Sequence, residues 1–226
     1  MDHNRTGSSY KDLKIRYYDI HTHQPSVSQN AVSVVSIDNS QSAVLDSGYY
    51  SVGIHPCYAD IERLPIIEKM AELPNVVAIG EAGLDKMASI PIKLQEKIFI
   101  SQLEIAEKNR KPLIIHCVKA WPELIRIRKQ FASDIQWIIH GFRGNGELAR
   151  QLLRFGFYLS FGLHFNPDAL RAAWETHRLY AETDEANIRI EEVYLHISSQ
   201  LSITEEALSR EIHENILNSF RIFAPD

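Results

Sequence analysis

The stretch VVAIGEAGLDKMASIPIKLQEKIFISQLEIAEKNRKPLIIHC, residues 76–117, has the clearest secondary-structure pattern in the sequence. Its two apolar runs, Val76–Ile79 and Leu113–Ile115, are typical of parallel strands that are covered on both faces. Between them, Ile92–Lys108 carries apolar residues at the spacing of one helix face. Because parallel strands need a crossover connection, usually a helix, this stretch predicts a β-α-β unit.

The same alternation continues on both sides of this unit. The predicted strands are Ile15–Ile20, Val32–Ile37, Tyr50–Ile54, Val76–Ile79, Leu113–Ile115, Ile135–Ile139, Phe157–Ser160 and Leu179–Ala181. The predicted helices are Ile61–Leu73, Ile92–Lys108, Trp121–Phe131, Gly146–Phe155, Asp168–Glu175, Ile188–Gln200 and Thr204–Phe220. Strand followed by helix, repeated about eight times, predicts an α/β protein with the (β/α)8 TIM-barrel fold.

This barrel is predicted to be abbreviated around strands one to three. The segment Gln24–Asn30 has no helical pattern. Asn39–Gly48 has room for at most about two helical turns. A chain of 226 residues lies near the lower end for this fold and fits one domain. We therefore predict a loose N-terminal extension over residues 1–14 and a single barrel domain over residues 15–226.

Composition and charge narrow the function classes. The net charge of −5 gives no basic footprint for tight, non-specific binding of nucleic acid, although bound divalent cations would change the field at a nuclease site. No apolar run reaches the roughly 18 residues of a membrane span, and the N-terminus lacks a secretory pattern. Having only two cysteines, Cys57 and Cys117, fits a reducing compartment. We predict a cytoplasmic protein without a membrane segment or an obligate protein partner.

Good metal ligands follow almost every predicted strand. In a TIM barrel, the active site lies at the C-terminal ends of the strands, so these side chains should share one face. Each alone is more often an ordinary polar residue, but their coincidence at successive strand ends favours one site. The residues are His21, His23, His55, Glu81, Asp85, His116, His140 and Asp184.

These residue types predict a site for two ions. His21 and His23 are two apart, so an extended backbone places both imidazoles on the same side, where they could bind one ion. Imidazole together with carboxylate suits zinc, manganese or iron. Glu81 could bridge two ions, and a buried carboxylate is tolerable when it is paired or metal-bound. The predicted ligands are His21, His23, Glu81, His116, His140 and Asp184.

The motifs that carry these residues resemble the TatD-type metal-dependent deoxyribonuclease family, within the amidohydrolase superfamily. Their order and spacing run across nearly the whole chain. The resemblance implies a TIM barrel that hydrolyses phosphodiester bonds in DNA with Mg, Mn or Zn. The motifs are Asp19-Ile20-His21-Thr22-His23, Gly53-Ile54-His55-Pro56, Ile79-Gly80-Glu81-Ala82-Gly83-Leu84-Asp85, Pro112-Leu113-Ile114-Ile115-His116-Cys117, Ile139-His140-Gly141-Phe142, Glu182-Thr183-Asp184 and the late segment Asn215–Phe220.

The resemblance also implies a role for each residue. It assigns His21 and His23 to the first metal, Glu81 to the bridge between both metals, and His116 and His140 to the second. Asp184 would be the last ligand of the first metal and would accept the proton of the attacking water, so Asp184 and Glu81 are the predicted catalytic residues. His55 and Asp85 match positions near the site, where we expect contact with substrate.

A cation is expected beside the scissile phosphate. Arg143 is the first candidate, because a guanidinium can bind phosphate oxygens with two parallel hydrogen bonds. Lys86 and Lys119 are alternatives, and an ordinary solvated loop charge is the competing interpretation of Arg143. The backbone amides of residues 144–146, which precede a predicted helix, could add to a phosphate pocket.

The loops that would face substrate depart from the family pattern. No proline follows Thr183-Asp184, and Lys86 and Met87 stand where aromatic residues are common. Two rival interpretations therefore remain. One is an amidohydrolase-type enzyme that acts on an amide, ester or lactone, although many of those enzymes carry a bridging modified lysine where Glu81 stands here. The other is a non-catalytic metal-binding barrel, which the complete ligand set disfavours.

Overall fold

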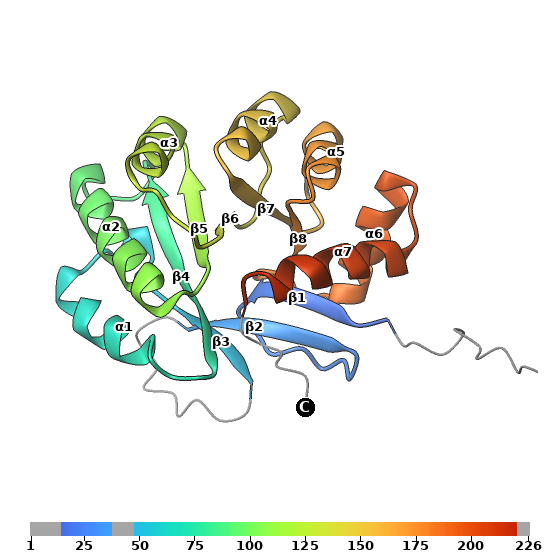
Figure 1. The fold of residues 1–226 in the computed structure, drawn as a ribbon, viewed down its shortest axis with the longest axis horizontal. Coiled ribbons are helices and arrows are strands. Elements are labelled where there is room, and N and C mark those ends of the chain that lie inside the picture. The colour runs from blue at the N-terminus through green and yellow to red at the C-terminus, as the bar shows by residue number, and fades with distance from the viewer. Residues whose placement is uncertain (1–14, 38–47, 221–226) are drawn as a thin grey trace, which may run out of the picture.

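Eight parallel strands form one sheet in the order β1 to β8, and helices lie outside it (Figure 1). The computed structural model describes residues 15–37 and 48–220, so the predicted extension over residues 1–14 lies outside the described residues. The strands are β1 Tyr17–Thr22, β2 Ala31–Ile37, β3 Tyr49–Val52, β4 Val76–Asp85, β5 Leu113–Val118, β6 Trp137–Ile139, β7 Phe157–Phe161 and β8 Leu179–Ala181.

The first and last strands meet at their C-terminal ends. Thr22 forms a parallel bridge with Asp184. The Asp184 N–H donates to the His21 carbonyl at 3.0 Å, and the His23 N–H donates to the Asp184 carbonyl at 3.2 Å. The sheet is therefore a nearly closed barrel, which confirms the predicted TIM-barrel fold. This junction also places the predicted ligands His21 and His23, at the end of β1, next to Asp184, which follows β8.

The helices confirm most of the predicted pattern. They are the short 3-10 helices η2 Pro56–Tyr58 and η3 Ile61–Arg63, and the α-helices α1 Leu64–Met70, α2 Ile92–Asn109, α3 Trp121–Gln130, α4 Gly146–Arg154, α5 Pro167–Glu175, α6 Ile190–Leu201 and α7 Glu205–Leu217. Within the described ranges, no helix joins β1 to β2, as predicted, whereas most of the Asn39–Gly48 crossover lies outside them. No described helix has the length and apolar character needed to cross a membrane.

The core lies between the sheet and the outer helices. On α2, Phe99, Leu103 and Ala106 are buried, and they share one helix face because they are spaced by four and three residues. The helix packs against β4, and Phe99 meets the buried ring of Trp137 edge-on, with ring centroids 5.8 Å apart. The apolar residues whose spacing predicted this helix are therefore the residues with which α2 packs in the core.

Two elements differ most from the sequence prediction. β4 continues to Asp85, six residues past the predicted end at Ile79, so Glu81 lies inside a strand. The predicted helix Ile61–Leu73 is a 3-10 turn followed by the shorter helix α1. Pro65 explains the break, because a proline is accommodated in the first turn of a helix but not in its interior.

Gly83 allows the extension of β4. Its φ is +159°, and a Cβ atom at this position would overlap the backbone carbonyl oxygen of His116 on β5. The two strands pair here, with Gly83 opposite His116. A glycine that looks like a turn signal in the sequence is therefore a point of close backbone approach within the sheet.

Candidate metal centre

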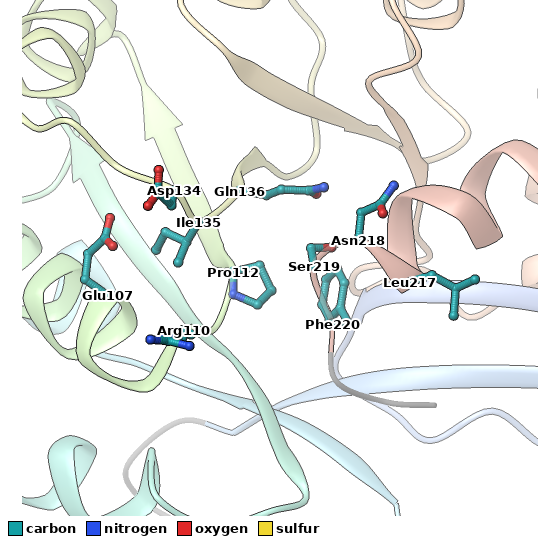
Figure 2. A pocket seen from close by; sticks show the side chains of 10 residues that line it. All are labelled: Glu107, Arg110, Pro112, Asp134, Ile135, Gln136, Leu217, Asn218, Ser219 and Phe220. Atoms are coloured by element: carbon teal, nitrogen blue, oxygen red, sulfur yellow. The ribbon is translucent and has the colours of Figure 1, made fainter. Parts of the chain in front are cut away.

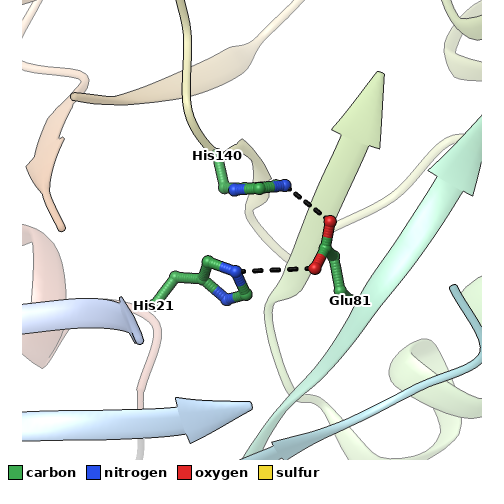
Figure 3. A group of neighbouring side chains, drawn as sticks. All are labelled: His21, Glu81 and His140. Carbon is green, nitrogen blue, oxygen red and sulfur yellow. Dashed lines mark hydrogen bonds and ion pairs between the residues drawn. The ribbon is translucent and has the colours of Figure 1, made fainter. Parts of the chain in front are cut away.

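Glu81 lies at the centre of a cluster of histidines at the C-terminal mouth of the barrel. Its Oε1 lies 2.7 Å from His140 Nε2, 2.8 Å from His116 Nδ1 and 3.2 Å from His55 Nε2. Its Oε2 faces His21 Nε2 at 3.6 Å. Figure 3 shows His21 and His140 pointing toward the two oxygens of this carboxylate from different elements. One carboxylate thus joins both sides of the mouth.

These contacts shift the pKa values of groups in the cluster. Burial alone would raise the pKa of Glu81, but hydrogen bonds with His116 and His140 outweigh it and hold the pKa well below its ordinary range. Burial would lower the pKa of His140, but Glu182 and Glu81 raise it well above its ordinary value. Glu81 is therefore a carboxylate stabilised by imidazoles, which is the charge state that binds a cation.

A second group forms where β1 meets β8. Asp184 Oδ1 lies 3.5 Å from His21 Nε2 and 3.7 Å from His23 Nε2. Burial would raise the pKa of Asp184, but the nearby imidazole of His21 and the charge of His140 lower it. The side chain of Asp184 is 32% exposed and that of Glu81 11%, so Asp184 is the carboxylate more open to the cavity.

The ends of β1 and β8 are fixed by a buried carboxylate that sequence reasoning gave no role. Asp19 accepts hydrogen bonds from the Thr183 N–H at 3.0 Å and from Thr183 Oγ1 at 2.6 Å. Burial, opposed by these bonds, raises the pKa of Asp19 to about 7. Because Thr183 precedes Asp184 and Asp19 lies two residues before His21, this contact sets the spacing of the second group.

The donor arrangement fits metal ions. His21 is fully buried, yet no described residue hydrogen-bonds either of its ring nitrogens. Its nearest carboxylate oxygens, at 3.5 and 3.6 Å, are too far for good hydrogen bonds, and an ion between them would satisfy the orphaned nitrogen. Ligand atoms converge within 4.8 Å in the groups His21–Glu81–His140, His21–His23–Asp184 and His55–Glu81–His116.

Asp85 orients a histidine of the cluster. Its Oδ2 lies 3.1 Å from His116 Nε2, so the ring of His116 is held between Asp85 and Glu81. The backbone of Asp85 is fixed by Gln95, whose Oε1 accepts its N–H at 2.7 Å and whose Nε2 donates to its carbonyl at 2.9 Å. A carboxylate behind a ligating imidazole fixes the ring's tautomer and orientation.

Glu182 lies behind His140 as a charged neighbour, and sequence reasoning gave it no role. Its side chain is 1% exposed, Oε1 accepts the Gly141 N–H at 2.5 Å, and Oε1 lies 3.5 Å from His140 Nδ1. The signal was available, because Glu182 lies two residues before Asp184 at the end of β8. An acid at that spacing on an extended chain points to the same side as Asp184.

Replacing Glu182 with Gln should weaken metal binding by about 10- to 100-fold while the fold survives. The amide keeps the shape of the carboxylate and can still accept the Gly141 N–H, but it no longer stabilises His140 electrostatically. Metal affinity measured by isothermal titration calorimetry on metal-free protein checks this. Unchanged affinity would show that Glu182 supports only the loop at Gly141.

The predicted phosphate-binding cations lie apart from the cluster. Arg143 is exposed, and none of the described hydrogen bonds or ion pairs joins it to a ligand. Lys86 forms an ion pair with Glu123 at 2.8 Å. Lys119 is exposed and contacts the sulfur of Met87 at 3.4 Å. The role of Arg143 at a phosphate stays a prediction.

The cluster forms the floor of a cavity of about 510 Å³. Of the described residues, neither a lysine nor an arginine lines it. The lining residues are His23, Ser36, Ile37, Gly53, His55, Cys57, Tyr58, Glu81, His116, His140, Asp184 and Glu185. The larger cavity in Figure 2, of about 750 Å³, lies at the opposite end of the barrel and contains none of the predicted ligands.

Fold and site together define a class of protein: a (β/α)8 barrel with a histidine–carboxylate cluster suited to metal ions at its C-terminal mouth. A family profile described as TatD related DNase matches residues 22–221. The chain therefore belongs to the TatD-related DNase family.

Individual relatives agree with this assignment. Over 119 residues, 50% of this chain and 47% of the relative, the chain is 36% identical to a metal-dependent hydrolase, YabD, of Bacillus subtilis. It is also 36% identical to the 3′-5′ ssDNA/RNA exonuclease TatD of a Rahnella species, over 52% of this chain and 44% of that protein. The matched part thus spans about half the length of these curated relatives.

Solved structures share the fold. The crystal structure of YJJV, a TatD homologue from Escherichia coli, superimposes with a TM-score of 0.78 over 92% of this chain and 99% of that chain, at 18% identity. A TatD family hydrolase from Entamoeba histolytica gives a TM-score of 0.69 over 92% of this chain and 99% of that chain, at 16% identity. At these sequence identities, the superpositions show only that the barrel fold is shared.

Proposed function

We propose that this protein is a metal-dependent phosphodiesterase that shortens single-stranded DNA from a free 3′ end. The observation that carries the proposal is the convergence of His21, His55, His116 and His140 on the single carboxylate Glu81. The substrate class is supported by the TatD exonuclease of Rahnella and by the human relative named as a 3′-5′ RNA nuclease.

The site would hold two divalent ions, Mg, Mn or Zn. His21, His23 and Asp184 would bind one ion, and His116 and His140 the other, while the two oxygens of Glu81 face one group each. When bound, such ions supply the positive charge that makes a water molecule acidic and neutralises the phosphate. That charge matters here, because no described lysine or arginine lines the cavity.

The chain's own residues would position the water and move its proton. Water oxygen bonds to phosphorus while the ester P–O bond breaks, and the released hydroxyl oxygen takes a proton from solvent. Asp184 would accept the proton of the attacking water at its side-chain carboxylate, because it is part-exposed to the cavity and its lowered pKa keeps it ionised. Asp85 and Glu182 would keep His116 and His140 in place.

The test is cleavage of a 5′-labelled single-stranded oligonucleotide with a free 3′ end, first by metal-free protein and then with Mg, Mn or Zn restored. Stepwise shortening that depends on metal is the expected result. Protein that binds metal but leaves the DNA intact would refute the nuclease proposal. Turnover of an amide, ester or lactone in a panel of such substrates would then indicate an amidohydrolase-type activity. If no substrate in the panel is turned over, the protein is a non-catalytic metal-binding barrel.

The variant Asp184→Asn should lower turnover at least ~100-fold, the usual scale for losing a general base. Asn fits this position sterically, because Asp184 has φ +55° and Asn tolerates that conformation. Its backbone bonds to β1 would also remain, so the far-ultraviolet circular dichroism spectrum should not change. A fully active Asp184→Asn protein would exclude Asp184 as the proton acceptor.

A further inference from the structure

The metal-site cavity is lined mainly by imidazoles and carboxylates, but Ile37, Cys57 and Tyr58 line it as well. Tyr58 is 68% exposed, which leaves most of a large aromatic ring open to solvent at the mouth. A single exposed aromatic residue is ordinary on a protein surface, so exposure alone does not indicate a binding role. The position of Tyr58 in the lining of the metal-site cavity does.

The backbone fixes Tyr58 relative to the metal ligands. Tyr58 is the last residue of η2. Its N–H donates to the His55 carbonyl at 2.9 Å, and His55 Nδ1 accepts the Cys57 N–H at 3.1 Å. The other nitrogen of His55, Nε2, lies 3.2 Å from Glu81 Oε1. One imidazole therefore holds the turn with one nitrogen and faces the cluster with the other.

The ring of Tyr58 stands next to this imidazole. The ring centroids of Tyr58 and His55 are 6.0 Å apart, with planes inclined by 49°. A phosphate bound at the cluster would have its nucleoside in or next to this cavity, which no described lysine or arginine lines. Tyr58 would add affinity through the base, because an aromatic face binds any base by stacking.

We propose that Tyr58, exposed in the lining of this cavity, forms a subsite that stacks the nucleobase next to the scissile phosphate. The inference rests on the proposed function and adds what the site recognises: an unpaired, unstacked base and not a long stretch of backbone. A terminal base that stays paired and stacked in a duplex would not be free to stack on Tyr58.

The test compares two single-stranded oligonucleotides of equal length. One carries normal bases throughout, and the other carries abasic tetrahydrofuran residues at its last two 3′ positions. Wild-type kcat/KM should be about tenfold higher for the first substrate, on the scale that alanine substitution gives for base stacking. Tyr58→Ala should remove this preference by slowing only the base-bearing substrate, and Tyr58→Phe should retain it.

Met87→Ala is the matched control. Met87 is 66% exposed and follows β4 at the same end of the barrel, but it does not line the cavity. This variant should keep the wild-type preference. If the wild type cleaves DNA but Tyr58→Ala retains the full preference for bases, the subsite is refuted and the proposed nuclease stands. If the wild type cleaves neither oligonucleotide, both the nuclease proposal and the subsite fall.

Discussion

The variant Glu81→Gln should lose about 1000-fold or more in turnover and bind at most one metal ion. Removing a residue that hydrogen-bonds a metal ligand already lowers metal affinity or activity about 10- to 100-fold. Removing a carboxylate that faces two ions should lower activity further. Glu81 has contacts with His21, His55, His116 and His140, so its carboxylate faces ligands of both proposed ions. The amide of Gln offers one oxygen, carries no charge and turns an N–H toward an imidazole.

Turnover with the DNA substrate and metal content by mass spectrometry measure this effect together. Glu147→Gln is the control, because Glu147 is an exposed carboxylate in the first turn of α4, at the same end of the barrel. The control should bind metal and turn over like the wild type. A Glu81→Gln protein that still binds two ions would contradict the bridging role.

The variant Gly83→Ala should lower the free energy of unfolding by about 3 kcal/mol or more, or prevent folding. The added methyl group would overlap the His116 carbonyl oxygen, and φ +159° is strained for a residue with a side chain. Relief requires β4 and β5 to separate, and these strands carry Glu81 and His116. Urea unfolding followed by circular dichroism measures the change.

Gly162→Ala is the matched control for this substitution. A Cβ at Gly162 meets its nearest atom, the Glu182 carbonyl oxygen, at an ordinary 3.5 Å. Its midpoint in urea should therefore stay close to the wild-type value. Wild-type stability of Gly83→Ala would mean that β4 and β5 do not approach as closely as described.

Much of the site could be predicted because barrel topology converts sequence order into geometry. Each strand delivers its C-terminal residue to one mouth, so His21, Glu81, His116, His140 and Asp184 could be grouped without any knowledge of side-chain direction. The closure of the barrel confirms the assumption on which that grouping depends, since Asp184 pairs with the end of β1. Their roles as ligands stay proposals until metal is measured.

Other features depend on contacts that one strand's sequence does not contain. The close approach of Gly80 and Gly83 to β5 cannot be predicted without the neighbouring strand. Asp19 and Glu182 act through Thr183 and His140, which are distant in sequence. The guanidinium of Arg143 suits a phosphate, but residue type alone does not say whether a loop side chain turns toward the mouth.

The number of ions that the wild-type chain binds shows whether the barrel mouth is a two-metal site. Protein freed of metal with a chelator would be dialysed against Mn²⁺ or Zn²⁺, and bound ions per chain counted by mass spectrometry alongside nuclease activity. We expect two ions per chain in the wild type, with activity returning as they bind, and at most one in Glu81→Gln. A wild-type chain that binds no ion, or cleaves DNA equally well without one, would contradict this expectation.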